Sequence, residues 1–430
     1  MDTKKDFENI TYKSCKIGLS HPPVHTPKRL IPRVNKTAIF RAPVEPPPLA
    51  MPGSDLPRVL NYMADYSGCG LWRIGAPEYL LNYNQKIIST SLTTMVLDPR
   101  FYLAGFKAIK LQRQATPVQK EFVKFLKHMG DKLEAKVIYE VDDIVIDYDI
   151  PLYNRCRVAF TDPEIQKSIK DIIEMCDEVL VASEYMKDYY KSKTTNKKVV
   201  YIPNYAPKMW FDRYYNEKIL MERFEKNKKR PRVLITGSGT HYDVANTNGQ
   251  KDDYTHVVQA IVDAKKDFKF VWMGGYPILL KPFIDNGDME FINWSPLMDF
   301  ANGIYNVEPQ VTMAALADNH FNRAKSWIKF TESSYLGIPF VGQDLNPYKD
   351  SYHKFINGTE MIDQLKLVTK DSSKYIEDCR KHRKFAETTW LDDHLQEHIA
   401  IYTTKYGEEK RKEVSPILCK NNPEQFSVQI

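Results

Sequence analysis

The sequence from residue 322 to residue 348 reads NRAKSWIKFTESSYLGIPFVGQDLNPY, and it carries the strongest indication of the fold. Its spacing of apolar residues predicts a helix over residues 326–336, and the apolar run behind it predicts a buried strand. Spacings of four and three residues place Lys325, Lys329 and Glu332 along one face of this helix. An exposed, salt-bridged helix is the simplest alternative. The strand that follows favours a helix packed against a sheet.

Short apolar runs alternate with helical periodicity on both sides of a charged break at residues 216–232. Such alternation is typical of parallel sheets covered by helices. The sequence therefore predicts an α/β fold in which two Rossmann-like, doubly wound domains face a cleft. The predicted segments are an N-terminal arm (1–55), a first Rossmann-like domain (56–215), a second Rossmann-like domain (216–385) and a C-terminal helix and tail (386–430).

The composition indicates a folded protein without a membrane span. The 430 residues are 43% hydrophobic and 27% charged, which is near the average for soluble globular proteins. The apolar runs are far shorter than the ~20 residues that a membrane-spanning helix needs. The first ten residues, MDTKKDFENI, lack the apolar core of a secretory signal. We therefore expect a cytoplasmic location.

The cysteines and the net charge bear on metal sites, disulfides and the charge of a partner. Six cysteines without CxxC spacing argue against a zinc site and against a disulfide framework. The net charge of +6 permits a polyanionic partner but does not require one. Five of the basic residues cluster in the predicted arm: Lys28, Arg29, Arg33, Lys36 and Arg41.

A glycine-containing turn follows the predicted strand 232–236. A strand that delivers glycines to the start of a helix presents free backbone N–H groups to an anion, and such folds hold a diphosphate in this way. A tight turn without any ligand is the competing interpretation. The residues of this turn are Gly237, Ser238, Gly239, Thr240 and His241.

Two cations and a carboxylate near such a turn suit a nucleotide. Lysines can neutralise the diphosphate that departs when a glycosidic bond forms, and a carboxylate can accept hydrogen bonds from both hydroxyls of a ribose. The spacing of Glu332, Gly337 and Pro339 resembles the donor-binding motif of retaining GT-B-fold glycosyltransferases of the glycosyltransferase group 1 type. The resemblance implies that Glu332 binds the ribose of the nucleotide.

The chain departs from this family at one position. The family has a second glutamate eight residues before the first, and that residue contacts the donor sugar. This sequence has Ala324 there. The departure implies that the sugar differs from glucose or is held by other groups.

Segments of the N-terminal half are similar to the same family. Residues 68–77, GCGLWRIGAP, are similar to the family's first loop, which implies that Gly70 and Arg73 contact the donor. Residues 137–151, VIYEVDDIVIDYDIP, resemble a stretch of phage-encoded and bacterial members. Two further similar stretches, DEVLVASEYMKDYY and VVYIPNYAP, begin at Asp177 and Val199.

Two pairs of aspartates compete for a role in the cleft. Asp147 and Asp149 form a DxD tripeptide, which in the other main glycosyltransferase fold holds a divalent metal. Such tripeptides are common by chance, and we predict no metal site. Asp142 and Asp143 end a predicted strand, so their side chains are expected at the crevice, as acceptor ligands or as a base.

The resemblance implies a glycosyltransferase that uses a nucleotide-sugar donor, a UDP-sugar, as substrate and needs no cofactor. The second domain would bind the donor and the first domain the acceptor. The reaction would proceed with retention and without a metal. His241, Lys325 and Lys329 would stabilise the departing diphosphate, and Asp142, Asp143 or the donor phosphate would take the proton.

The expected acceptor is inferred from the resemblance to phage-encoded members of the family. Some phage glycosyltransferases modify hydroxymethylated DNA bases, and the cations of the arm suit a phosphate backbone. We therefore expect a hydroxymethylated pyrimidine in duplex phage DNA as acceptor, in the host cytoplasm. Glycan, lipid and protein acceptors are alternatives, as is a GT-B-fold sugar epimerase. A two-lobed sugar-binding protein would need no cations for a leaving group.

Overall fold

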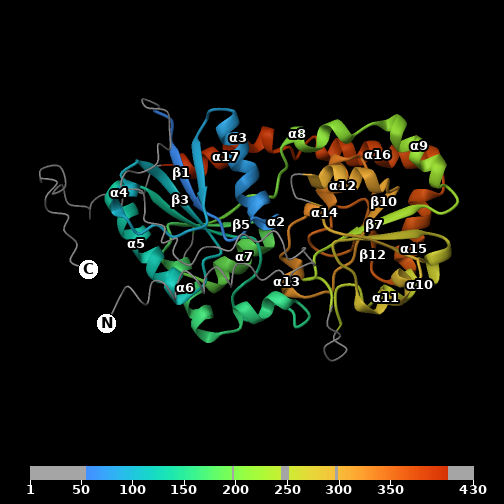
Figure 1. Ribbon diagram of the computed structural model, residues 1–430, viewed down its shortest axis with the longest axis horizontal. Helices are drawn as coiled ribbons and strands as arrows, with labels where there is room; N and C mark the ends of the chain where they lie inside the picture. The colour runs from blue at the N-terminus through green and yellow to red at the C-terminus, as the bar shows by residue number, and fades with distance from the viewer. Residues whose placement is uncertain (1–54, 196–197, 244–250, 296–298, 405–430) are drawn as a thin grey trace, which may run out of the picture.

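The computed structural model describes residues 55–195, 198–243, 251–295 and 299–404. Two α/β domains lie side by side (Figure 1), and each contains a sheet of six strands. All strand pairs in both sheets are parallel. This architecture confirms the predicted pair of Rossmann-like domains. The predicted arm, apart from its last residue, and most of the predicted tail lie outside the described residues.

The first sheet has the strand order β2-β1-β3-β4-β5-β6. The central strand β4 is buried along its whole length, as expected for a parallel sheet with both faces covered. Its strands are β1 (Arg58–Tyr62), β2 (Ile88–Leu92), β3 (Phe106–Gln112), β4 (Lys136–Val141), β5 (Glu178–Val181) and β6 (Val199–Tyr201). The helices of this half are α2 (Gly68–Gly70), α3 (Ala76–Tyr83), α4 (Pro99–Tyr102), α5 (Pro117–Leu133), α6 (Pro163–Met175), α7 (Glu184–Lys193) and α8 (Lys208–Phe211).

Helix α5 begins where local chemistry dictates. The side chain of Thr116 accepts a hydrogen bond from the Gln119 amide, and the Gln119 side chain accepts one from the Thr116 amide. Pro117 occupies the first turn, where its missing N–H is not needed. The helix then buries one face against the sheet, with Phe122, Val123, Leu126 and Met129.

The second sheet has the strand order β12-β11-β10-β7-β8-β9. Its strands are β7 (Arg232–Thr236), β8 (Lys269–Met273), β9 (Glu290–Ile292), β10 (Val311–Ala314), β11 (Phe340–Gln343) and β12 (His353–Phe355). Its helices are α9 (Glu217–Asn227), α10 (Val258–Asp263), α11 (Lys281–Asp285), α12 (Phe300–Val307), α13 (His320–Arg323), α14 (Ile328–Tyr335), α15 (Gly358–Thr369) and α16 (Ser372–Ala386).

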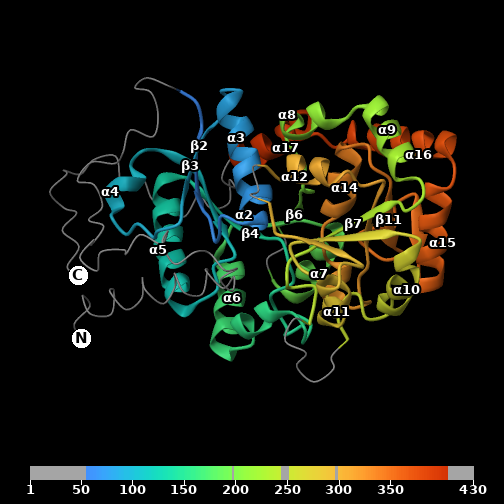
Figure 2. The same ribbon diagram turned by 45° about the vertical axis from the view of Figure 1, so that its right-hand side comes forward.

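The last described helix, α17 (Leu391–Thr403), returns to the first domain. It lies beside α3 in both ribbon views (Figures 1 and 2) and contacts α3 and β3. Leu391 and Leu395 belong to the same buried cluster as Val59 of β1 and Ala108 of β3. The C-terminal segment thereby completes the core of the first domain.

Two helix starts differ from the sequence prediction. No helix begins at the glycine turn, because the next described helix, α10, starts only at Val258. Helix α14 begins at Ile328, so Lys325 lies in the turn between α13 and α14 and not on the same helix as Lys329. The expected helix over residues 326–336 is therefore shorter at its N-terminal end.

Candidate active site

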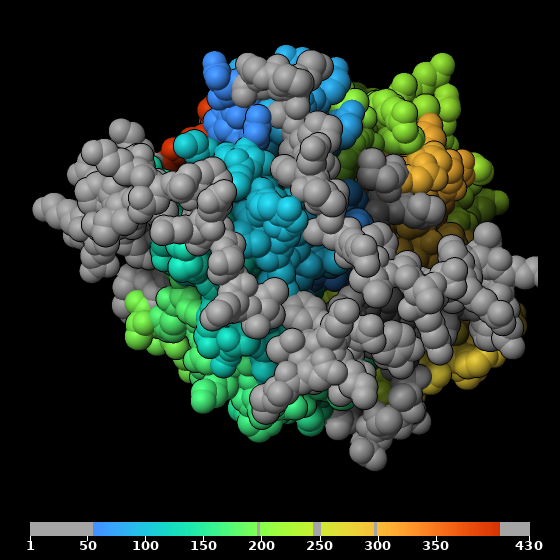
Figure 3. Space-filling model, turned by 60° about the vertical axis from the view of Figure 1, so that its left-hand side comes forward, coloured from blue at the N-terminus to red at the C-terminus, as the bar shows by residue number. Residues whose placement is uncertain are grey.

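The two domains adjoin, and the space-filling view shows residues of the first domain, in blue to green, beside residues of the second, in yellow to orange (Figure 3). Three side-chain contacts join residues 324–326 to the first domain. Ser183 Oγ donates to the Ala324 carbonyl at 2.6 Å, and Asn204 Nδ2 donates to Ser326 Oγ at 3.0 Å. The third is an ion pair between Lys325 and Asp143. The turn that precedes α14 is therefore fixed against the first domain.

Lys325 and Asp143 face each other from opposite domains. Their Nζ and Oδ1 atoms are 3.5 Å apart. Burial alone would lower the pKa of the Lys325 ammonium, but Asp143 and other nearby carboxylates hold that pKa above its ordinary value. Burial raises the pKa of Asp143 despite the attraction of Lys325. The two predicted site residues thus form one charge pair across the cleft.

Lys329 and Glu332 lie next to each other on α14 without forming an ion pair within the described part of the chain. The Lys329 ammonium is shielded from solvent and has no hydrogen-bond partner among the described residues. Burial lowers the pKa of Lys329 to about 8 and raises the pKa of Glu332 to about 8. Both residues line a small pocket with Thr236 of β7 and Thr312 of β10. This pocket therefore combines a buried cation with a buried carboxyl group.

The glycine turn lies at the end of β7, as predicted. The Gly237 amide donates to the Met273 carbonyl at 3.1 Å, which joins the turn to β8. A Cβ atom at Gly237 would lie 2.3 Å from the Tyr242 hydroxyl oxygen, so only glycine fits there. Ser238 Oγ and Thr240 Oγ1 are 2.6 Å apart. The turn thus lies directly after β7, and no helix begins within residues 237–243, so the described residues show no helix dipole directed at it.

His241 is oriented by an aspartate that the sequence did not single out. Its Nδ1 lies 2.7 Å from Oδ2 of Asp253, which is fully buried. Burial lowers the pKa of His241 to about 3, and the nearby Lys329 charge acts in the same direction. The imidazole is therefore neutral near pH 7, with Nδ1–H donating to the carboxylate. This differs from the expected cationic role of His241 toward a diphosphate.

Asp253 collects hydrogen bonds from both domains. Its Oδ1 accepts from the Tyr153 hydroxyl at 2.5 Å and from the Ala317 amide at 3.0 Å, and also from the Asn322 side chain. These donors help to keep the pKa of Asp253 below its ordinary value, although burial alone would raise it. Its only sequence signal was the acidic pair at residues 252–253 after a polar run.

Asp142 is held on its own side of the cleft. Its Oδ1 lies 3.5 Å from Nε of Arg113, which also pairs with Asp65. Burial would raise the pKa of Asp142, but Arg113 holds it below its ordinary value. Of the two predicted aspartates, only Asp143 forms an ion pair across the junction within the described residues.

Arg73 and Gly70 are engaged inside the first domain. Arg73 is 3% exposed and donates to Glu140 Oε1 at 2.7 Å, to the Ile202 carbonyl at 2.6 Å and to Asn204 Oδ1 at 2.9 Å. A Cβ at Gly70 would lie 1.9 Å from a backbone oxygen, so glycine permits close packing there. Arg73 therefore ties together the strand ends of the first sheet, which is a different role from the predicted contact with the donor.

Comparison with known proteins identifies the architecture. No family model matches the chain, and no curated protein matches it. A crystal structure of Anabaena Alr3699/HepE in complex with UDP superposes with a TM-score of 0.52 at 11% identity, covering 80% of this chain and 98% of that one. The same protein in complex with UDP-glucose gives the same values. This chain has the GT-B fold.

The DxD tripeptide of this GT-B protein lies in a salt-bridged surface segment. Asp147 pairs with Lys170 at 2.6 Å and with Lys193 at 3.2 Å, and Asp149 accepts a hydrogen bond from the Tyr189 hydroxyl at 2.6 Å. Among the described residues, no group of three or more His, Cys, Asp or Glu side chains could hold a metal ion. Within the same residues, no helix is long and apolar enough to cross a bilayer.

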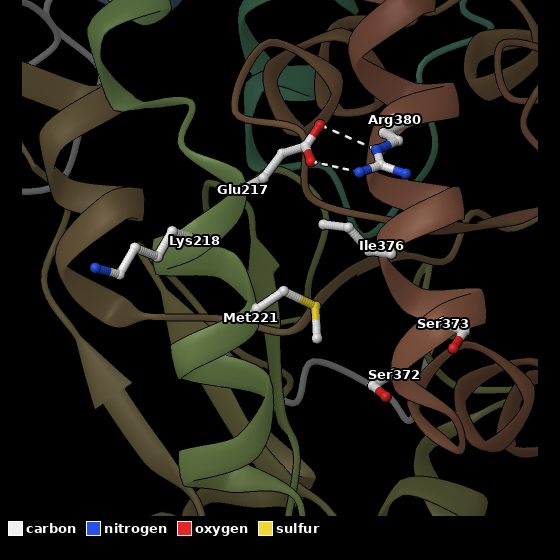
Figure 4. Close-up of a pocket in the computed structure, with 7 residues that line it drawn as sticks. All are labelled: Glu217, Lys218, Met221, Ser372, Ser373, Ile376 and Arg380. Atoms are coloured by element: carbon white, nitrogen blue, oxygen red, sulfur yellow. Dashed lines mark hydrogen bonds and ion pairs between the residues drawn. The ribbon is translucent and has the colours of Figure 1, made fainter.

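A second, open pocket of about 390 Å³ lies between α9 and α16, away from the cleft (Figure 4). Its polar groups are largely satisfied, because Arg380 and Glu217 form an ion pair at 2.7 Å. Met221 and Ile376 supply apolar surface, and Lys218 points away from this pair in the close-up. None of the predicted site residues lines this pocket, so the candidate active site is the cleft.

Proposed function

We propose that this protein is a glycosyltransferase that moves a sugar from a UDP-sugar to an acceptor hydroxyl. The observation that carries the proposal is the buried Lys329 ammonium, which lacks a hydrogen-bond partner among the described residues. Burying an unpaired cation is costly, so such a group in a cleft indicates an anionic ligand. The amides of Ser238 and Gly239, which donate no hydrogen bond among the described residues, and the nearby Glu332 suit the diphosphate and the ribose of a nucleotide.

The chemistry assigned to these residues is stabilisation of a leaving group. The bond between the anomeric carbon and the donor phosphate oxygen breaks, and its electron pair leaves on the diphosphate. Lys325 and Lys329 offset this charge, which is more effective in a shielded cleft than in water. The acceptor oxygen bonds to the anomeric carbon, and its proton goes to the departing phosphate or to Asp143. We propose retention at the anomeric carbon, in keeping with the family resemblance.

His241 fits this scheme as a neutral hydrogen-bonding group. With Nδ1–H donating to Asp253, its Nε2 carries a lone pair that can accept a hydrogen bond from a sugar hydroxyl. The Asp253 contacts fix the tautomer and the ring orientation. We therefore propose that His241 orients the donor sugar. It would then bind the sugar in place of the glutamate that the family has at the position of Ala324.

We favour a glycan, lipid or protein acceptor over hydroxymethylated DNA. The five cations that suggested DNA belong to the arm, which lies outside the described residues. The similar Anabaena protein is described in complexes with UDP, glucose and UDP-glucose, and these are small carbohydrates and nucleotides. The DNA acceptor stays a prediction that the assay below includes.

The test measures UDP binding by calorimetry and UDP release from a panel of UDP-sugars. We expect UDP to bind and to be released slowly without an acceptor. Production of a free or nucleotide-bound epimer would indicate a sugar epimerase. Absence of binding and of release with every donor would refute the donor assignment. Release should accelerate with the true acceptor, so oligosaccharides and hydroxymethylated duplex DNA are added in separate arms.

A further inference from the structure

A loop of the first domain reaches across the cleft and is fixed there by one side chain. Tyr153 donates its hydroxyl hydrogen to Asp253 Oδ1 at 2.5 Å and accepts a hydrogen bond from Asn322 Nδ2 at 3.0 Å. Both partners belong to the second domain. Two residues later, Arg155 begins a short 3-10 helix that ends at Phe160. The Tyr153 contacts therefore determine where Arg155 lies relative to the second domain.

The Arg155 guanidinium packs against the glycine turn. A Cβ atom at Gly239 would lie 3.3 Å from both Cζ and Nη1 of Arg155. The neighbouring Cys156 is close enough to Asp143, Lys325 and Arg155 for their charges to affect its pKa. Arg155 thus stands at the same point of the cleft as the cross-domain charge pair, although it comes from the opposite side to the turn.

Within the described part of the chain, Arg155 has no partner that would explain its position. Its Nε is buried and unbonded, and among the described residues its side chain forms no hydrogen bond or ion pair. Burial lowers the pKa of Arg155, and the neighbouring Cys156 acts in the opposite direction. By contrast, Arg157 of the same short helix donates to the carbonyls of Tyr148 and Ile150. A guanidinium has five N–H donors, and a buried N–H of this kind seldom lacks an acceptor unless a ligand supplies one.

We propose that Arg155 is a ligand of the donor diphosphate, supplied by the first domain to the phosphate site of the second. This inference rests on the proposed function and adds a residue to it. A guanidinium presents a planar fork that matches two phosphate oxygens, whereas lysine offers a point charge. Its N–H groups would donate to the oxygens that gain charge as the anomeric bond breaks. Arg155, Lys325 and Lys329 then surround the diphosphate from both domains.

The proposal makes domain closure part of leaving-group stabilisation. Arg155 lies at the glycine turn in the arrangement in which Tyr153 is bonded to Asp253 and Asn322. A donor bound to the second domain alone would lack one of its three cations. The enzyme would therefore cleave the donor efficiently only in the closed arrangement, which limits hydrolysis by water before the acceptor is in place.

The test compares the binding of UDP and of uridine to Arg155→Gln by calorimetry. We expect UDP affinity to fall roughly 10- to 100-fold, the loss typical of a charge-assisted contact, with uridine affinity unchanged. Arg157→Gln removes the same charge from the same short helix and should leave both affinities unchanged. Arg155→Lys keeps the charge without the fork, so its loss should be intermediate. If Arg155→Gln does not fold, the UDP affinity of Arg155→Lys decides whether Arg155 binds the diphosphate.

The outcomes separate this inference from the proposed function. If the unaltered protein binds no UDP, the proposed function fails. If it binds UDP and Arg155→Gln does so within twofold, Arg155 is not a diphosphate ligand and the function stands. Equal losses for UDP and uridine would also overturn the inference, because they would indicate a general disturbance of the cleft. Added guanidinium ion should partly restore transfer by Arg155→Gln, an effect that a merely structural arginine would not show.

Discussion

Replacing Lys329 with methionine should make the protein more stable and bind UDP less tightly. Burial holds the pKa of Lys329 at about 8, below its ordinary value of 10.5. Each tenfold change in proton affinity corresponds to about 1.4 kcal/mol, so the buried ammonium costs roughly 3 kcal/mol at pH 7. Lys329→Met removes this cost at nearly constant volume. We expect the free energy of unfolding to rise by roughly 2 to 3 kcal/mol.

The pH dependence of this gain has a definite sign. Below pH 8, Lys329 is protonated in both the folded and the unfolded protein, so the full cost of burial is present. Between pH 8 and about 10.5, the folded protein loses the proton while the unfolded chain retains it, and the cost declines. The stability difference between Lys329→Met and the unaltered protein should therefore be constant near pH 7 and shrink as the pH rises through this window.

Lys325→Met is the matched control, because Lys325 has a counter-ion. Removing it leaves Asp143 without its partner and removes the contact of the ammonium with the Phe321 ring, so stability should fall by roughly 1 kcal/mol. Urea unfolding measures both variants, and calorimetry with UDP should show weaker binding for both. If Lys329→Met is no more stable than the unaltered protein and binds UDP equally well, Lys329 is not an unpaired buried cation awaiting a diphosphate.

Three further predictions test other parts of the site and the core. Glu332→Gln should weaken uridine and UDP binding equally, by roughly tenfold, because it alters the ribose contact and not the phosphate contact; calorimetry with both ligands checks this. Sugar transfer should persist in EDTA, since lysines and backbone amides are assigned the diphosphate; loss of activity with rescue by manganese would contradict this. Burial holds the pKa of His382 at about 4, so between pH 6.5 and pH 4 the unfolded chain binds a proton at this residue and the folded protein does not. The free energy of unfolding should therefore fall by roughly 3 kcal/mol over this range. Urea unfolding at several pH values checks this, and the free energy of unfolding of His382→Gln should depend less on pH.

Local sequence patterns were sufficient to predict the fold and part of the site. Parallel strands place the residues that follow them at one edge of the sheet, so Asp143 and the glycine turn were expected at the crevice. Helical spacing placed Lys329 and Glu332 together. These predictions depend only on residues near each other in the chain, and periodicity encodes such relations well.

The break before α14 could not be read from periodicity. Phe321 and Ala324 pack in the core of the first domain, whereas Phe330 packs in a cluster of the second. Their spacing is compatible with one continuous helix. The chain turns between them because the two groups of residues serve different domains, and this turn brings Lys325 to Asp143.

Contacts between domains were equally invisible in the sequence. Asp253, Tyr153 and Arg155 acquire their roles only when distant segments meet, and none of them belongs to a periodic pattern. Asp253 shows the consequence most clearly. Its pairing orients the imidazole of His241, whereas burial lowers the pKa of that imidazole and keeps it neutral. A sequence motif predicted that the histidine lies in the site, but the charge state depends on burial and on Lys329.

Some cations of this cleft have a counter-ion and others have none, and this difference argues for an anionic ligand that both domains bind. Lys325 has a counter-ion from the opposite domain, whereas Lys329 and Arg155 have none among the described residues. The shielding that makes an unpaired cation costly also strengthens its attraction for an anion. Because Lys329 belongs to the second domain and Arg155 to the first, one anion between them relieves both costs only when the domains are together. We therefore expect donor binding to be thermodynamically coupled to domain closure, so that the donor binds more tightly to the closed arrangement than to an open one.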